Sequence, residues 1–429
     1  MHLQRRHAPD PLIAPHRSGP TESSLHHPPE SGAPVPAVVP SPVSYRPVRL
    51  PGRVTVGVLS TYPPTQCGLA TFSAALVEQL NEQPGTAGVV RIVDRPESHP
   101  GVEVVGHLVN SSPASAVAAV RQLNGFGAVV VQHEYGIFGG PDGADVLDLV
   151  DALTVPLTIV LHTVLQEPTA RQRHILLRLL DAADVVVTMT ETARNRLLAD
   201  YGADPADVVV VPHGAADHGV PDVALRAARL AADRPLVLTW GLLGPGKGIE
   251  SAIDALPGLR DLRPRYLVAG RTHPKVLERD GEHYREGLQR RAADLGVADA
   301  LELDARYLDS GELADLVQRA DVVLLPYDSR EQVTSGVLIE AVAAGRPVVS
   351  TAFPHAVELL GDGTGLVVPQ RDPAALGAAL RRVLAEPGLA DAMADRAARK
   401  APDLLWSAVA ARYLRIAESL VASAVTMAS

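Results

Sequence analysis

The sequence predicts two α/β domains, each built on a doubly wound parallel sheet with helices on both faces. Valine-rich runs alternate with helical stretches along most of the chain, which is the pattern of a parallel sheet covered on both sides. The length of 429 residues suggests two or three domains at ~150 residues each. A break at 214–221 separates two such series. Because ligands in these sheets bind beyond the carboxyl ends of the strands, two sheets facing each other would form a cleft.

The first 50 residues differ from the rest of the chain in composition. They contain eleven prolines and five of the fifteen histidines. Proline at this density blocks helix interiors and sheet ladders, and the segment has little apolar surface to offset the entropy of ordering. We expect a disordered arm, in which His26 and His27 are solvated tail residues rather than a pair of metal ligands.

The first α/β series begins at Arg53. The run 54–60 predicts a strand, the turn 61–64 follows it, and residues 67–72 open a helix over 73–83. The series continues with strands at 89–93, 128–132, 157–161, 185–189 and 208–211 and with helices at 115–123, 144–153, 170–182 and 191–201.

The second series follows a helix expected at 222–232. Its strands are expected at 236–240, 265–269, 301–303, 322–326, 347–350 and 365–368, and its helices at 249–256, 285–295, 310–318, 335–344, 373–385 and 389–399. A last amphipathic helix covers about 405–422. The expected organisation is a 1–50 arm, a 51–217 domain, a 218–400 domain, and a 401–429 helix that packs back toward the first domain.

Composition excludes several classes of protein. Aromatic residues make up 3% of the chain and the net charge is −10, which argues against a base-stacking nucleic-acid binder or a general polyanion binder. The single cysteine, Cys67, excludes an internal disulfide framework and a Cys-rich zinc module. There is neither an apolar run long enough for a membrane span nor a secretory signal, so we expect a cytoplasmic protein. Peripheral contact with a membrane stays open.

The glycine-rich segment 244–248 (Gly-Pro-Gly-Lys-Gly) lies between an expected strand and an expected helix. Glycines let the backbone approach an oxyanion closely, and the following helix start offers free N–H groups. Lys247 adds a charge suited to phosphate, although the spacing is not that of a P-loop. A plain strand–helix turn is the alternative reading.

A second segment, 331–341, places Thr334, Ser335 and Gly336 where a helix should begin. Glu340 lies about one turn further in, where its carboxylate could accept two hydrogen bonds from a vicinal diol such as a ribose. The alternative is an ordinary surface glutamate. Its apolar sequence neighbours favour the binding role, since a charge seldom stays unpaired in such company.

Three expected strands end in histidine: His133, His162 and His213. His133 or Glu134 could orient a substrate hydroxyl, although a buried or capping histidine is the alternative. The spacing of the three histidines matches no metal motif, so we predict no metal site.

These features together resemble GT-B glycosyltransferases, specifically glycosyltransferase family 4. The resemblance rests on two Rossmann-like halves, the loop after the first strand, the Lys-Gly loop at Lys247 and the glutamate helix, and it covers about 53–420. It is most specific over 322–350. It implies a retaining transferase that takes a sugar from a nucleotide diphosphate sugar, usually without a metal, with the donor mainly on the C-terminal half and the acceptor mainly on the N-terminal half. No cofactor is implied, and a saccharide, a lipid or a small molecule could be the acceptor.

Site residues follow from the resemblance one by one. It implies that Lys247 binds the donor diphosphate, that Glu340 binds the ribose and that Gly68 closes over the donor. His133 matches the histidine near the transferring sugar, with Glu134 and Tyr135 beside it on the acceptor side. The backbone amides near the phosphates are expected from Ser335, Gly336 and Val337.

Two positions depart from the family pattern. Gln332 stands where the first motif glutamate is usual, and Glu331 is one place too early. Leu242 stands where the loop arginine is usual, which leaves the second diphosphate cation open. Arg271 is a candidate by its position at a strand end, with an ordinary surface arginine as the alternative.

A mechanism without a catalytic carboxylate pair fits these residues. Fixed cations and amide dipoles would stabilise the departing diphosphate, and the leaving phosphate oxygen would take the acceptor's proton. The nearest alternatives are a nucleotide-sugar epimerase of similar architecture and a catalytically silent sugar-nucleotide binder. A glycoside phosphorylase would need a longer chain with pyridoxal phosphate, and no G-x-G-x-x-G supports an NAD enzyme.

Overall fold

The structure of the protein is a computed structural model that describes residues 54–83, 85–97, 101–219 and 234–428. The expected arm at 1–50 and the expected helix at 222–232 lie outside these residues. All described residues fall within one compact unit, Tyr45–Ser429. Among the described helices, none is both long enough and apolar enough to span a bilayer.

The first sheet has seven strands, and every pairing in it is parallel. Their order is β3 (Val104–Val109), β2 (Ala87–Val93), β1 (Val56–Ser60), β4 (Ala128–His133), β5 (Leu157–Leu161), β6 (Val185–Thr188) and β7 (Val208–Val210). The helices of this N-terminal half are α1 (Gly68–Leu80), α2 (Pro113–Leu123), α3 (Val146–Asp151), α4 (Ala170–Ala182) and α5 (Glu191–Tyr201).

The second sheet has six strands, again all parallel. Their order is β10 (Leu301–Asp304), β9 (Arg265–Ala269), β8 (Leu236–Trp240), β11 (Val322–Leu325), β12 (Val348–Thr351) and β13 (Gly365–Val368). The helices of this C-terminal half are α7 (Ile249–Ala255), α8 (Pro274–Asp280), α9 (His283–Asp294), α10 (Ser310–Arg319), α11 (Gly336–Ala343), α12 (Pro354–Leu360), α13 (Pro373–Ala385) and α14 (Leu389–Leu404).

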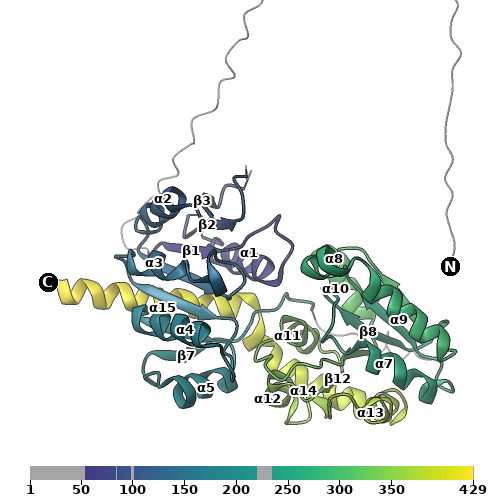
Figure 1. Cartoon of the computed structure of the whole chain (residues 1–429). Helices are drawn as coiled ribbons and strands as arrows, with labels where there is room; N and C mark the ends of the chain where they lie inside the picture. The colour runs from purple at the N-terminus through teal and green to yellow at the C-terminus, as the bar shows by residue number, and fades with distance from the viewer. Residues whose placement is uncertain (1–53, 84, 98–100, 220–233, 429) are drawn as a thin grey trace, which may run out of the picture. The chain divides into compact units, whose positions relative to one another are not determined.

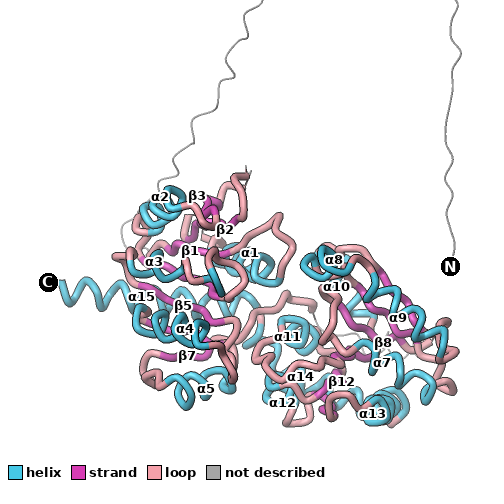
Figure 2. Tube along the Cα trace, in the orientation of Figure 1, coloured by secondary structure: helices cyan, strands magenta, loops and turns pink. Residues whose placement is uncertain are grey.

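The predicted fold class is confirmed: the chain contains two α/β sheets of parallel strands with helices around them (Figure 2). Each sheet carries two apolar clusters, one for each face. Leu59 and Val131 lie in one cluster of the first sheet, whereas Val58 and Val130 lie in the other. Adjacent residues of one strand therefore pack in opposite directions, which is why the strands read as continuous apolar runs.

Some elements differ from the sequence prediction. Strand β3 was not predicted because Gly106 and His107 interrupt its apolar run, and it is the partly exposed edge of its sheet. The short helices α8 and α12 were also missed, and both start at a proline. Helix α14 continues past its predicted end at Arg399 and includes Pro402.

The chain's last helix, α15 (Trp406–Ala428), packs against α1 and β4 of the N-terminal half. Figure 1 shows this yellow helix alongside elements coloured purple and teal. Its residues Val409, Tyr413 and Ala417 share an apolar cluster with Phe72 and Leu76 of α1. The backbone of Ala215 meets the junction between α14 and α15, because Ala215 N donates to Leu404 O at 2.7 Å and Trp406 N donates to Ala215 O at 2.9 Å.

Candidate functional site

The glycine-rich loop after β8 depends on glycine at one position in particular. Gly248 has φ 62°, and a Cβ atom there would lie 1.8 Å from the carbonyl oxygen of Pro326. Asp328 N donates to Gly246 O at 2.9 Å, which joins the loop to the segment after β11. The loop is therefore packed against the strand end, and any side chain at Gly248 would push the two segments apart.

Lys247 carries the loop's positive charge. Its Nζ lies 4.3 Å from the ring centroid of Tyr327, a cation–π contact. The Tyr327 ring is buried and stacks on Phe353 at 5.2 Å. Within the described residues, Lys247 has no carboxylate at ion-pair distance. An aromatic face thus holds the lysine in place and leaves its charge available to an anion.

The start of α11 provides backbone donors near this loop. The Ser335 hydroxyl accepts from Leu338 N at 3.2 Å, and Ser335 N donates to His355 Nδ1 at 2.8 Å. The amides of Gly336 and Val337 donate to no acceptor in the part of the chain that the structure describes. A Cβ at Gly241 would lie 3.8 Å from the Val337 side chain, so the loop and the helix start adjoin. Two of the three amides expected at the phosphates are therefore available, whereas that of Ser335 is already bonded.

Glu340 is partly buried and already has partners. His218 Nε2 lies 2.8 Å from its Oε2, and Ala216 N donates to both carboxylate oxygens at 3.3 Å. The side chain is 23% exposed. The segment that follows the first sheet, with Ala216 and His218, therefore supplies the partners expected for a charge with apolar sequence neighbours. A carboxylate has more acceptor positions than these contacts use, so Oε1 can still accept a hydroxyl.

Glu331 is committed to the N-terminal half. Its Oε2 accepts from Arg196 Nη1 at 2.9 Å and from Gln166 N at 3.0 Å. Gln332 instead donates to the carbonyl oxygen of Thr334 at 3.2 Å. Among the described residues, neither side chain contacts Glu340, and the Glu331 carboxylate is used in the contact with Arg196.

His133 ends β4 and has no exposed surface. Its ring packs against Tyr135 and Phe138, with centroids at 5.0 and 6.3 Å. Both ring nitrogens are buried and have no hydrogen-bond partner among the described residues. Burial lowers the pKa of His133 to about 4, so the ring is neutral at pH 7. A buried polar group with no partner is uncommon in a native protein, which makes His133 a residue to test by substitution.

Glu134 and Tyr135 continue from His133 with different surroundings. The Glu134 carboxylate accepts from Thr163 Oγ1 at 2.5 Å and from Tyr135 N at 3.0 Å. Burial raises its pKa. The Tyr135 hydroxyl donates to Gln172 O at 3.3 Å, so it serves the contact with α4. The Tyr135 hydroxyl is therefore already bonded, whereas the Glu134 carboxylate can accept further hydrogen bonds.

Two of the three strand-end histidines, His162 and His213, pack against the ring of Phe72. Phe72 meets the rings of His162 and His213 edge-on, each at 5.0 Å. His162 Nε2 bonds Gln132 Oε1 at 2.7 Å, and His213 Nδ1 bonds Gly214 O at 2.6 Å. In the described ranges, no group of three His, Cys, Asp or Glu side chains could hold a metal ion.

Arg271 and the loop before Gly68 come together across the two sheets. Arg271 Nη1 donates to Gln66 Oε1 at 2.8 Å. Gly68 is the first residue of α1, and a Cβ there would meet nothing within 4 Å. The buried Arg91 fixes this loop from below, since it donates to Tyr62 O at 3.0 Å and to Thr65 Oγ1 at 2.9 Å. Arg91 thus fixes the loop, and the space beside Gly68 has room for a ligand.

Sequence reasoning missed several residues near these groups. Tyr327 supports Lys247, His218 pairs with Glu340, and Lys275 lies 3.4 Å from where a Cβ of Gly136 would be. Tyr327 directly follows Pro326 at a strand end, a position that could have identified it. His218 and Lys275 carry no local signal, because their partners are distant in sequence.

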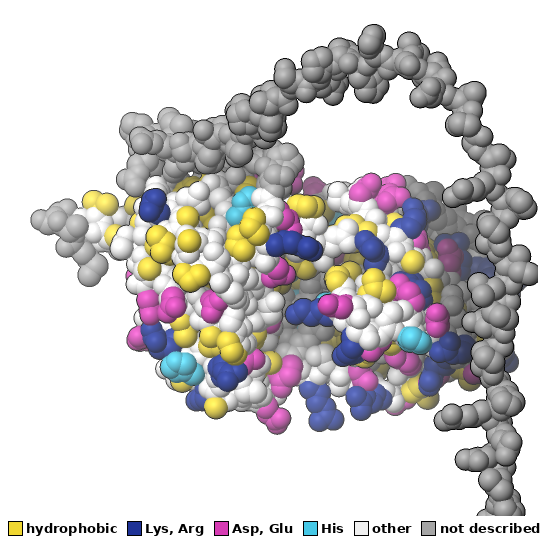
Figure 3. All heavy atoms as spheres, turned by 45° about the horizontal axis from the view of Figure 1, so that its top comes forward, with side chains coloured by type: hydrophobic (Ala, Val, Ile, Leu, Met, Phe, Trp, Pro, Cys, Tyr) yellow, Lys and Arg dark blue, Asp and Glu magenta, His cyan; other side chains and the backbone are white. Residues whose placement is uncertain are grey.

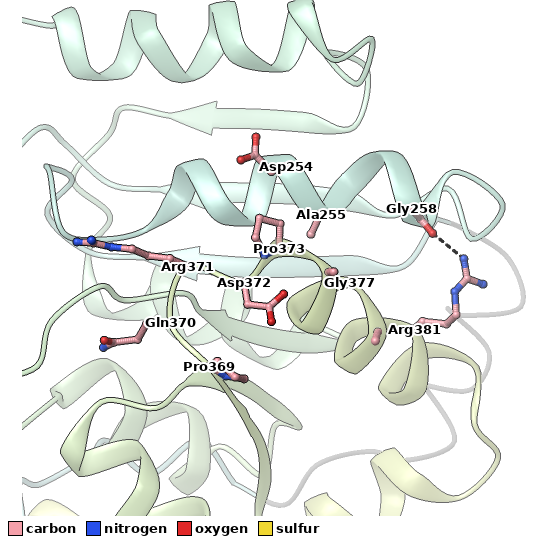
Figure 4. A pocket seen from close by; sticks show the side chains of 12 residues that line it. Asp254, Ala255, Gly258, Pro369, Gln370, Arg371, Asp372, Pro373, Gly377 and Arg381 are labelled. Carbon is pink, nitrogen blue, oxygen red and sulfur yellow. Dashed lines mark hydrogen bonds between the residues drawn. The ribbon is translucent and has the colours of Figure 1, made fainter.

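Two cavities lie away from these residues. One of about 850 Å³ lies beside α7 and α13, and Figure 4 shows Arg381 at its edge bonded to the carbonyl of Gly258. A second, of about 570 Å³, is lined by Arg196, Glu358 and their neighbours. Neither is lined by Lys247, Glu340 or His133.

Comparison with known proteins gives two family matches. Residues 68–217 match the model of Glycosyltransferase Family 4, and residues 224–400 match that of Glycosyl transferases group 1. A D-inositol 3-phosphate glycosyltransferase of Kineococcus radiotolerans is 34% identical over 256 residues, which are 56% of this chain and 58% of the relative. A GDP-mannose-dependent alpha-(1-6)-phosphatidylinositol monomannoside mannosyltransferase of Mycolicibacterium smegmatis is 34% identical over 236 residues, 53% of this chain and 59% of the relative. The chain thus spans less than two thirds of the length of these relatives.

Solved structures share the fold at low sequence identity. HepE of Anabaena in complex with UDP and glucose has a TM-score of 0.69 at 15% identity, over 85% of this chain and 100% of that chain. Sucrose-phosphate synthase of Thermosynechococcus elongatus has a TM-score of 0.68 at 19% identity, over 86% and 100%. The family models match both halves and the fold matches over most of the chain. The chain therefore belongs to the GT-B glycosyltransferases, with a family 4 domain in its N-terminal half and a group 1 domain in its C-terminal half.

Proposed function

We propose that the protein is a retaining glycosyltransferase that moves a sugar from a nucleotide diphosphate sugar to a hydroxyl acceptor without a metal. The observation that carries this proposal is the unpaired Lys247 beside the free amides of Gly336 and Val337. A cation and two N–H donors on adjoining segments suit a diphosphate. The M. smegmatis relative is named for GDP-mannose, and HepE binds UDP, which supports a nucleotide-sugar donor here.

The reaction needs no side-chain acid under this proposal. The bond between the anomeric carbon and the leaving phosphate oxygen breaks, and the acceptor oxygen bonds to the same face of that carbon. The acceptor's proton passes to the leaving phosphate oxygen. Lys247 and the α11 amides stabilise the charge that develops on the diphosphate, the largest catalytic effect available to such a site.

The two halves have different roles in this proposal. The C-terminal half (218–400) holds the donor through Lys247, Glu340 and the start of α11, with Arg271 as the second cation. The N-terminal half (51–217) presents the acceptor at Glu134, which follows the buried His133 at the end of β4. Gly68 lets its loop approach the donor, since nothing occupies the space beside it.

A panel of nucleoside diphosphates tests the donor site. A ligand present at about 100 times its dissociation constant should add about 2.7 kcal/mol of stability, a clear rise in Tm. The nucleotide that gives the shift is then tried as its sugar conjugates in a transfer assay, with and without a chelator. A flat response to every nucleotide contradicts the proposal, and loss of transfer with the chelator contradicts its metal independence.

Glu340→Gln should weaken nucleotide binding by about 1–3 kcal/mol while lowering stability less. Only the oxygen of the amide can accept a ribose hydroxyl, so the diol is left poorly matched. Calorimetric titration of the best nucleoside diphosphate measures the loss. His218→Ala is the control, because it removes the contact with Glu340 but keeps the carboxylate. If Glu340→Gln lowers only Tm, then Glu340 serves the contact with His218 alone.

His133→Asn should reduce turnover at least about tenfold, a loss of ~1.4 kcal/mol of transition-state stabilisation, with little change in nucleotide affinity. His133 lies at the end of an N-terminal-half strand, whereas the nucleotide is held by the C-terminal half. Steady-state kinetics and nucleotide titration separate the two effects. A parallel loss of nucleotide affinity would move His133 to the diphosphate, and normal turnover would make it a packing residue.

A further inference from the structure

One arginine of the first sheet has its charge inside the protein. Figure 3 shows Lys and Arg side chains on one face of the molecule, where water solvates their charges. The Arg91 side chain is only 2% exposed, and its strand β2 pairs it with Ser60 at the end of β1. A buried charge is costly unless it is paired and hydrogen-bonded, so the partners of Arg91 indicate its role.

All three nitrogens of the Arg91 guanidinium group have partners, and two of these partners lie in the loop 61–67 that follows β1. Nε donates to Tyr62 O at 3.0 Å, and Nη2 donates to Thr65 Oγ1 at 2.9 Å. Nη1 lies 3.0 Å from Glu97 Oε2. The arginine therefore holds the loop against the sheet beneath it.

The partners of Arg91 do not depend on it. Tyr62 O also accepts from Thr65 N at 3.1 Å, and the Glu97 side chain is 39% exposed, so water can solvate it. Replacement of buried ion pairs by apolar side chains of similar volume is often neutral or stabilising. Stability alone therefore does not account for a charge at position 91, whereas placement of the loop does.

The loop reaches the donor side of the site through Gln66. Arg271 Nη1 donates to Gln66 Oε1 at 2.8 Å, and the Arg271 side chain has no other acceptor among the described residues. A guanidinium group has five N–H donors, so four are left for phosphate oxygens. Because these donors form a rigid planar fork, an acceptor on one nitrogen fixes the direction of the others.

We propose that Arg91 is a positioning residue, which holds the loop 61–67 so that Gln66 orients Arg271 toward the donor diphosphate. Arg91 is buried and acts through the loop, without contact with either substrate. The proposal rests on the donor site proposed above and adds the group that sets the geometry of its second cation.

Calorimetric titration with UDP, GDP, ADP and dTDP measures the effect on the donor site. Arg91→Met has an apolar side chain of similar length. It should weaken the nucleotide that wild type binds about tenfold, about 1.4 kcal/mol. Gln66→Ala should have an effect of the same size. In an Arg271→Ala background neither substitution should weaken binding further, because the group that they orient is absent.

Two further variants separate positioning from structural damage. Thr65→Val removes one contact between Arg91 and the loop, so it should also weaken the nucleotide, and it serves if Arg91→Met does not fold. Arg346→Met is the matched control, because Arg346 is also buried, at 3%, but donates to the backbone of Gln318 and Ala344. Its effect on nucleotide affinity should be the same with and without Arg271.

Hydrogen exchange in the nucleotide-free protein tests whether Arg91 holds the loop. Exchange of the amides in 61–67 should be at least about tenfold faster in Arg91→Met, because the loop opens more often without its buried contacts. Exchange in β4 and β5 of the same sheet should stay unchanged. A general increase across the sheet would mean that Arg91 only supports the fold.

Three results of the titrations would overturn the proposal. They are unchanged nucleotide affinity in Arg91→Met or Gln66→Ala, a loss of affinity that persists in full without Arg271, and tighter binding by Gln66→Ala, which would mean that Gln66 competes with the diphosphate for Arg271. If wild type binds none of the four nucleotides, the proposed donor site has failed and this proposal falls with it. Normal nucleotide binding by every variant means that only the positioning role has failed.

Discussion

Lys247→Ala should lower kcat/KM for sugar transfer by about 10²–10³ while leaving the fold intact. The loss of one donor that stabilises developing charge typically has an effect of this size. Fold stability should change little, because Lys247 is partly exposed and, among the described residues, its side chain contributes a cation–π contact with Tyr327 and no ion pair. Steady-state kinetics and a melting curve on the same preparation measure the two quantities.

Two control variants separate the charge of Lys247 from its contact with Tyr327. Lys247→Arg keeps the charge and the contact with Tyr327, so it should recover a substantial part of the rate. Tyr327→Phe keeps the aromatic face beneath the lysine and removes only a hydroxyl that has no partner among the described residues. Near-normal turnover of Lys247→Ala would mean that another cation, with Arg271 the first candidate, holds the diphosphate.

Acidification from pH 6.5 to pH 4 should unfold the protein cooperatively, because buried histidines must remain neutral in the folded chain. Burial lowers the pKa of His133 to about 4 and that of His355 to about 3, from 6.5. Above pH 6.5 neither state binds the proton, and stability is at its full value. Between pH 6.5 and about 4, only the unfolded chain binds a proton at these histidines. The free energy of unfolding then falls by about 1.4 kcal/mol per pH unit for each histidine. At pH 4 each costs about 3 kcal/mol, a large part of a typical stability of about 5–15 kcal/mol.

Urea denaturation at several pH values measures this loss as the slope of the unfolding free energy. His133→Asn and His355→Asn should each flatten the slope between pH 6.5 and 4, whatever their effect at neutral pH. His355→Asn keeps an acceptor for Ser335 N. The Asp362 carboxylate, which accepts from the Thr364 hydroxyl and pairs with Lys400, has a pKa of about 2 and titrates below this window. Glu134 has the opposite effect on stability. Its raised pKa lets the folded state bind a proton at a higher pH than the unfolded chain does. A stability that is constant from pH 6.5 to 4 contradicts the assignment.

Much of the fold could be predicted from the sequence because its signals are local. Valine-rich runs marked most strands of both sheets, and the strands 157–161, 236–240 and 265–269 agree residue for residue with β5, β8 and β9. The glycine at 248 was recognisable as part of a loop. The folded structure shows why it must be glycine, because the clashing atom belongs to Pro326, far along the chain.

Local patterns predict the fold class, the two series of strands and helices, and the candidate residues at strand ends and helix starts, since each depends on neighbours a few positions away. Which of their atoms are free depends on the folded arrangement. Glu340 meets His218, Glu331 meets Arg196, and Lys275 meets the turn at Gly136. Charge pairing and burial depend on groups that are distant along the chain and adjacent in space, and no local pattern encodes them.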